Sequence, residues 1–176
     1  MQNNDHHGID NKFARDEAVA ADTSTDPAVL DAIARKPVDR GTSDQRLSRN
    51  VGYARENVAR NPSALPETLE WLSQLTSDYM VIAGVMENPN TPLDVLWSAA
   101  NHAESHIASL IVQNPGCGDA FILRVVDLHA GNLDVALRAL RNPSITNETF
   151  ELIAASVESR WDIVVDELRS ARHDRE

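Results

Sequence analysis

The chain is 176 residues long, which suits one domain of ordinary size or one short array of repeats. Its formal net charge of −11 argues against general nucleic-acid binding, since that affinity comes mainly from neutralising phosphates. Cys117 is the single cysteine, so the sequence excludes an internal disulfide and a metal site built from several thiolates.

Periodic apolar positions, prolines and polar start residues predict helices along the whole chain. The expected helices span 12–21, 27–35, 47–60, 66–75, 79–87, 92–103, 105–113, 119–129, 133–141, 147–157 and 160–171. No stretch alternates apolar and polar residues as a half-buried strand does. The sequence therefore predicts an all-α fold.

An Asn-Pro dipeptide recurs at a nearly constant interval. The asparagines are Asn61, Asn88, Asn114 and Asn142, at intervals of 27, 26 and 28 residues. Apolar residues keep the same register, for example Leu69 and Leu72, eight and eleven residues after the first Asn. Proline cannot continue a helix, so each Asn-Pro ends one helix before the next begins. With a degenerate copy at Asp22, the period predicts an α-solenoid of about five two-helix repeats of 26–28 residues.

The predicted organisation is a disordered N-terminal tail over 1–11 and a single helical-repeat domain over 12–176. The first copy carries about a dozen extra residues, so we expect a loop insertion over 36–50. The charged C-terminus predicts a capping helix over 158–172, because a solenoid must cover the last open face of its core.

Two segments carry a resemblance to a known family. Ala20–Ala34 reads AADTSTDPAVLDAIA and Val58–Leu72 reads VARNPSALPETLEWL. Both resemble the variant leucine-rich repeats of actinobacterial proteins, best over 18–76 and as a periodic echo through 157. The resemblance implies paired α-helices, or an α-helix paired with a 3₁₀ helix, in a right-handed superhelix. It also implies an interaction scaffold, with no catalytic residues to carry over.

Charge and tryptophan suggest where a partner could bind. From 61 to 123 there is no Lys or Arg while seven acidic residues remain, which indicates a solvated face or a negative surface for a basic partner. Trp71 and Trp97 stand beside the core stripe, where tryptophan either seals helix layers or anchors a partner. The candidate partner-binding residues are Trp71, Trp97, Glu67, Glu70, Asp94, Arg46 and Arg49.

Few residues suggest chemistry. His102 and His106 lie four apart on a predicted helix, and His129 could add a third ligand from the next repeat, but zinc takes four ligands and such surface pairs are common. Cys117 stands between two glycines ahead of a helix, which would expose its thiol and lower its pKa, yet no nearby histidine supplies a base. We expect a small residue in a turn there, and no catalytic, metal or cofactor site.

The favoured function is a non-catalytic scaffold that binds a protein or peptide, in particular a basic one, on an acidic repeat surface. The absence of a signal-peptide core and of an apolar run of about 20 residues favours the cytoplasm and no membrane insertion. An alternative is an inhibitor or immunity-type protein that neutralises a basic nuclease or toxin. A nucleic-acid-binding helical repeat is the third hypothesis and would require steep salt dependence.

Overall fold

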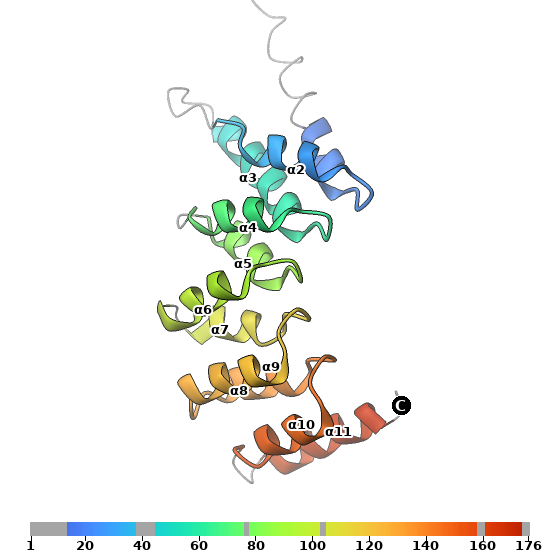
Figure 1. Cartoon of the computed structure of the whole chain (residues 1–176), viewed down its shortest axis with the longest axis vertical. Helices are drawn as coiled ribbons and strands as arrows, with labels where there is room; N and C mark the ends of the chain where they lie inside the picture. The colour runs from blue at the N-terminus through green and yellow to red at the C-terminus, as the bar shows by residue number, and fades with distance from the viewer. Residues whose placement is uncertain (1–13, 38–44, 76–77, 103–104, 158–160, 174–176) are drawn as a thin grey trace, which may run out of the picture. The chain divides into compact units, whose positions relative to one another are not determined.

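The structure is a computed structural model that describes residues 14–37, 45–75, 78–102, 105–157 and 161–173, of which 45–50, 102, 105 and 173 are described by their backbone alone. The chain forms two compact units, Met1–Pro92 and Leu93–Glu176. Figure 1 labels the helices of both units.

The first unit opens with a helical stretch over 14–21, followed by four labelled helices. These are α2 (Pro27–Ala34), α3 (Gln45–Arg60), α4 (Pro66–Ser73) and α5 (Tyr79–Glu87). Helix α3 packs against α2 and α5, and α4 packs against α5. The unit is thus built from helices that contact both their chain neighbours and the next helix but one.

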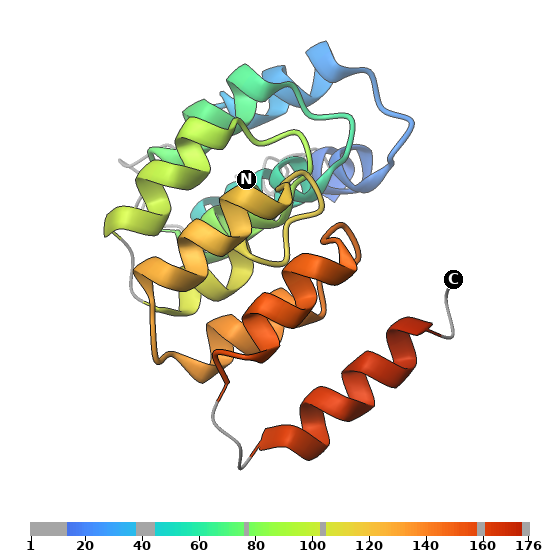
Figure 2. The same ribbon diagram turned by 60° about the horizontal axis from the view of Figure 1, so that its bottom comes forward.

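The second unit holds the remaining six labelled helices. These are α6 (Leu93–His102), α7 (Ser105–Ile111), α8 (Asp119–Leu128), α9 (Leu133–Leu140), α10 (Asn147–Ala154) and α11 (Asp162–His173). Helix α9 contacts α7, α8, α10 and α11. In Figure 2 the ribbon of α11, drawn in red, stands at the outer edge of this unit.

The all-α prediction is confirmed, since no described residue lies in a strand. Most helix ends fall within two residues of the expected ones, and α10 ends three residues early at Ala154. The loop expected over 36–50 is too long, because 45–50 already belong to α3. The expected capping helix over 158–172 corresponds to α11, which begins at Asp162, while 158–160 lie outside the described residues.

The apolar residues predicted from the period form the core. Leu30, Leu69, Leu96, Ile122 and Phe150, each eight residues after Asp22 or an Asn of the repeat, are all buried. Their helical partners three residues on are buried too, except for the half-buried Ala99. Each such side chain removed from water contributes roughly 1.5–3 kcal/mol, so this stripe stabilises the helix pairs.

Side chains that accept a backbone N–H set several helix starts. Asp26 accepts from Ala28 at the start of α2, and Thr146 accepts from Thr149 at the start of α10. Thr91, two residues before α6, is bonded differently. The Thr91 hydroxyl is buried and donates to the Val85 carbonyl at 2.5 Å, because its side chain points back toward the preceding helix.

Within each unit, the asparagine side chain of one Asn-Pro turn is bonded to the preceding turn. Asn88 Nδ2 donates to the carbonyls of Ala59 and Asn61 at 2.7 and 2.8 Å. Asn142 Nδ2 donates to those of Val112 and Asn114 at 2.8 and 3.1 Å. We call each such pair of hydrogen bonds a rung. In both rungs the donor and the two acceptors stand at the same positions of the repeat. Successive Asn-Pro turns in each unit are therefore bonded in the same register.

The degenerate copy at Asp22 keeps the accepting part of this pattern. Asn61 Nδ2 donates to the carbonyls of Ala20 and Asp22, which forms the first rung of the described chain. Asp22 Oδ1 accepts from the Ser24 backbone N–H at 2.9 Å, as Asn61 Oδ1 accepts from that of Ser63 at 2.8 Å. A carboxylate cannot donate a hydrogen bond as the asparagine amide does. Asp22 therefore suits this turn, because the described residues contain no earlier turn to which its side chain could donate.

Candidate functional site

Trp71, the first candidate from the sequence, is half-buried on α4 beneath two guanidinium groups. The Cζ atoms of Arg35 and Arg55 lie 5.2 and 5.3 Å from its ring centroid. Arg55 is also held in place, since its Nε and Nη2 donate to the carbonyls of Ala34 and Lys36 at the end of α2. The indole therefore already serves as an internal cation–π platform that joins α2, α3 and α4.

Charged neighbours stabilise this platform. Asp31 accepts hydrogen bonds from Arg35 at 2.9 Å and from the buried Thr68 hydroxyl at 2.6 Å. These bonds, first that of Arg35 and then that of Thr68, lower the pKa of the Asp31 carboxyl. Burial lowers the pKa of Arg55, and the nearby charge of Asp78 opposes this effect. The surroundings of Trp71 are thus mixed in charge rather than acidic.

Trp97, the second candidate, is half-buried on α6 and is also engaged. The Cζ atom of Arg124 lies 3.9 Å from its ring centroid, and the Phe121 ring meets it edge-on at 6.0 Å. Asp94 is exposed on the same helix. The structure thus brings Trp97 together with two residues of α8 that the sequence had not singled out.

The other candidate residues lie apart from these platforms. Glu67 and Glu70 are exposed on α4. Arg46 and Arg49 belong to α3 by their backbone, and their side chains lie outside the described residues.

The histidines form no metal site within the described residues. His106 is exposed, whereas the His102 side chain lies outside the described part of the chain. His129 Nε2 lies 3.2 Å from the Ala100 carbonyl, so its ring is already engaged. Among described residues, no group of three His, Cys, Asp or Glu side chains could hold a metal ion.

The expectation of an exposed Cys117 with a lowered pKa is wrong. Its side chain is 1% exposed, and burial raises the pKa of the thiol to about 11. The residue stands three positions after Asn114, as Ala64 and Thr91 stand after their own asparagines, and these two are also buried. Repeat position therefore outweighs the flanking glycines, and Cys117 is a packing residue.

We expect the Cys117 thiol to react at least 100-fold more slowly with an aromatic disulfide reagent at pH 8 in the folded chain than in urea. A pKa near 11 in place of the ordinary 9.0 lowers the thiolate fraction about 100-fold, and burial blocks access further. Absorbance of the released thiolate measures the rate. Equal rates in both states would show that the thiol is exposed.

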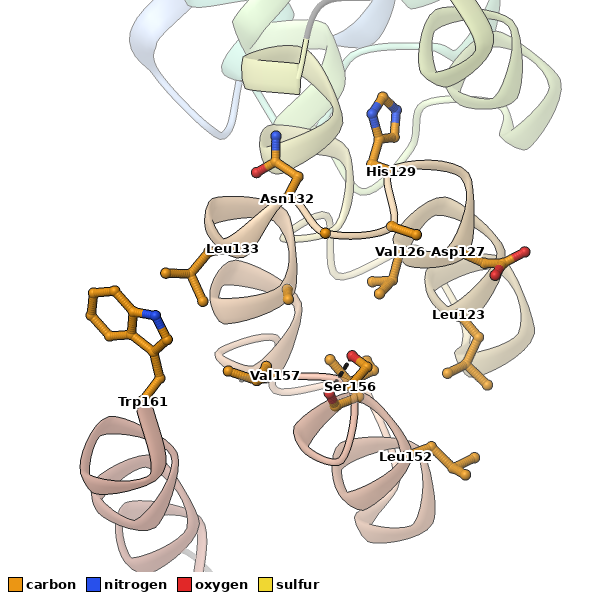
Figure 3. A pocket seen from close by; sticks show the side chains of 14 residues that line it. Leu123, Val126, Asp127, His129, Asn132, Leu133, Leu152, Ser156, Val157 and Trp161 are labelled. Atoms are coloured by element: carbon orange, nitrogen blue, oxygen red, sulfur yellow. Dashed lines mark hydrogen bonds between the residues drawn. The ribbon is translucent and has the colours of Figure 1, made fainter. Parts of the chain in front are cut away.

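An apolar pocket lies in the second unit, between α8, α9, α10 and Trp161 (Figure 3). Its volume is about 330 Å³. Its apolar lining comprises Leu123, Val126, Ala130, Leu133, Ala136, Leu152, Ile153, Val157 and Trp161. Figure 3 shows Trp161 and Leu133 on one side and Leu123 and Leu152 on the other. Leu152 is 56% exposed, so the pocket offers apolar surface directly to solvent.

Most polar side chains that line this pocket are bonded within the chain. Asn132 accepts from the Val135 N–H at the start of α9. The Ser156 hydroxyl donates to the Ile153 carbonyl at 2.6 Å. Asp127 alone among the lining residues carries a formal charge, and its exposed carboxylate pairs with no other described residue. A ligand could therefore meet a mainly apolar wall and one available carboxylate.

Arginines of α11 attach that helix to α10 beside the pocket. Arg169 donates to both carboxylate oxygens of Glu151, at 2.7 and 2.8 Å. Arg172 donates to the Ile145 carbonyl and to the Asn147 side chain, and both arginines lie over the Phe150 ring. These bonds hold α11 in the unit whose pocket Trp161 helps to line.

The register of the repeat carried a signal for this pocket. Leu123 follows Asn114 by nine residues, as Trp97 follows Asn88. Leu152 follows Asn142 by ten residues, the spacing that places Trp71 after Asn61. A search for any large apolar residue at these two positions, rather than for tryptophan alone, would have found two pocket residues.

No protein-family model, curated protein or solved structure matches the chain. Within the described helices, none is long and apolar enough to cross a membrane.

Proposed function

We propose that the chain is a non-catalytic protein-binding module of the cytoplasm, and that its helix pairs repeat as a right-handed α-solenoid of about five units. Two features support the repeat: the 26–28-residue Asn-Pro interval and the equivalent rungs of Asn88 and Asn142. The resemblance to variant leucine-rich repeats points the same way. Such arrays offer extended surfaces to protein partners.

The pocket of the second unit is the observation that carries this proposal. An open cavity of about 330 Å³ with a mainly apolar lining is large enough for one or two side chains of a partner. Leu152 at 56% exposure is the kind of apolar contact that a partner would cover. Trp71 and Trp97 are occupied by arginines of the same chain, so the pocket is the better anchor point.

The charge of the chain favours a basic partner. The formal net charge is −11, and Asp127 places a carboxylate at the pocket itself. A field of this sign raises the rate at which a positively charged protein associates. The proposed partner is therefore a protein with a basic surface and an exposed apolar side chain.

The test compares two exposed leucines of the second unit. The tagged chain and its Leu152→Asp and Leu128→Asp variants are used to capture partners from the native cells. The main partner is then purified, and its affinity is measured by calorimetry. Leu152 lines the pocket, whereas Leu128, which is 46% exposed, does not. We expect Leu152→Asp to weaken binding at least tenfold, because a buried leucine contributes about 1.5–3 kcal/mol.

We expect Leu128→Asp to stay within twofold of the native affinity. Equal affinities for both variants would remove the pocket from the interface and contradict the proposal. A one-to-one complex in which the chain blocks a basic nuclease would identify the module as an inhibitor that binds its target through the same surface.

A further inference from the structure

We infer that the segment recognised by this pocket carries an aliphatic or aromatic anchor with a Lys or Arg close beside it. The inference rests on the proposed function and specifies the partner's chemistry at the same pocket. The anchor fills the cavity between Leu123, Leu133, Leu152 and Trp161, and the cation pairs with Asp127.

The apolar part follows from the lining. Nine of the fourteen lining residues are apolar or aromatic. They come from α8, α9 and α10, from the turns before α9 and after α10, and from the residue before α11. The Oδ1 atom of Asn132 and the hydroxyl of Ser156 are already used in bonds to their own helix or turn. A strongly polar anchor would lose its water without gaining equivalent hydrogen bonds, which disfavours it.

The cationic part follows from Asp127. This carboxylate is exposed on α8, and Figure 3 shows it directed outward beside Val126. The pocket lining contains no Lys or Arg that could neutralise it. An anionic partner group would be repelled there, whereas a cationic group would be attracted to the exposed carboxylate. A partner segment with a cationic side chain next to its apolar anchor would pair with Asp127 and fill the apolar cavity at the same time.

A peptide segment fits this combination better than an uncharged apolar ligand. An acyl chain would match the apolar wall but would make no use of Asp127. A free amine would match the charge but would leave most of the roughly 330 Å³ empty. Neighbouring residues of a peptide provide both groups at a short, variable separation.

The experiment is a selection from a library of random 12-residue peptides displayed on phage, carried out with the full chain at moderate salt. Peptides that also bind Leu152→Asp are removed, so the remaining peptides depend on the pocket. We expect them to share one Leu, Ile, Met or Phe, with Lys or Arg within three positions enriched at least twofold over the input library.

The same selection is repeated with Asp127→Asn and with Asp94→Asn. Asp94 is an exposed acid of the same unit that does not line the pocket, so it controls for overall charge. We expect the basic enrichment to vanish with Asp127→Asn and to persist with Asp94→Asn. For one selected peptide, Asp127→Asn should weaken binding about two- to fivefold, as expected for an exposed ion pair.

The outcomes separate this inference from the proposed function. Pocket-dependent peptides without basic enrichment, or with enrichment that survives Asp127→Asn, would overturn the inference and leave the binding module standing. If no peptide depends on Leu152, both the anchor and the proposed use of the pocket are wrong. Circular dichroism of each variant confirms that the comparison is made between folded chains.

Discussion

Replacing Asn88 by alanine should lower the free energy of unfolding by about 3 kcal/mol. The Asn88 side chain is buried, and its amide donates to the carbonyls of Ala59 and Asn61. Its Oδ1 also accepts the Asn90 backbone N–H at 2.9 Å. Alanine removes these three bonds, each of which contributes about 0.5–1.5 kcal/mol. The Asn61 carbonyl keeps its bond from the Ala64 N–H, whereas the Ala59 carbonyl loses the Asn88 donor. Urea denaturation followed by circular dichroism measures the change.

A matched control and a second variant sharpen this test. Asn101 is exposed and donates to the Trp97 carbonyl, so Asn101→Ala should cost less than about 0.5 kcal/mol. Asn88→Asp should be at least as harmful as Asn88→Ala, because a carboxylate would face two carbonyl oxygens inside the protein. If Asn88→Ala and Asn101→Ala unfold at the same urea concentration, the rung does not stabilise the fold.

Replacing Gly84 by alanine should destabilise the chain by about 2 kcal/mol, although alanine is the better helix former. An added Cβ would lie 2.9 Å from Ala59 Cβ and 3.1 Å from Arg60 Cγ, so α3 and α5 would have to move apart. Overpacking of this kind costs about 1–3 kcal/mol and outweighs the helix propensity gained. Thermal and urea unfolding of the variant measure the loss.

A double variant isolates the contact between the two helices. Ala59→Gly removes the atom that clashes, so Ala59→Gly/Gly84→Ala should be more stable than the sum of the single changes by at least 1 kcal/mol. Gly52, also in α3, would place its Cβ 3.2 Å from Oδ2 at the end of the Asp78 side chain and, among the described residues, near no Cβ or backbone atom of a neighbouring helix, so Gly52→Ala should cost less than Gly84→Ala. A stabilising effect of Gly84→Ala alone would show that the helices are not in close contact there.

The candidate site was only partly predictable. The sequence places both tryptophans beside the core stripe, and both are half-buried, but their arginine partners come from other segments of the chain. Arg35 and Arg55 contact Trp71 from 36 and 16 residues earlier in the chain, distances at which no local pattern operates. The pocket escaped notice for the same reason, since its walls come from four successive segments.

The sequence alone determined the helices and the turns between them. Proline stops a helix wherever it follows an asparagine, and apolar residues eight and eleven positions later mark the buried side of the next helix. These are local effects, which act over a few residues and repeat with the period. They explain why most helix ends agree with the prediction within two residues.

Only the tertiary structure decided which polar and apolar groups remain available to a partner. Cys117 has glycines on both sides, yet its repeat position places it in the core. Trp71 is covered by arginines, whereas Leu152 and Asp127 remain open at the pocket. Whether a side chain is available to a partner depends on which side chains from distant segments pack against it. Local preferences do not contain that information, because it arises only when the helices pack.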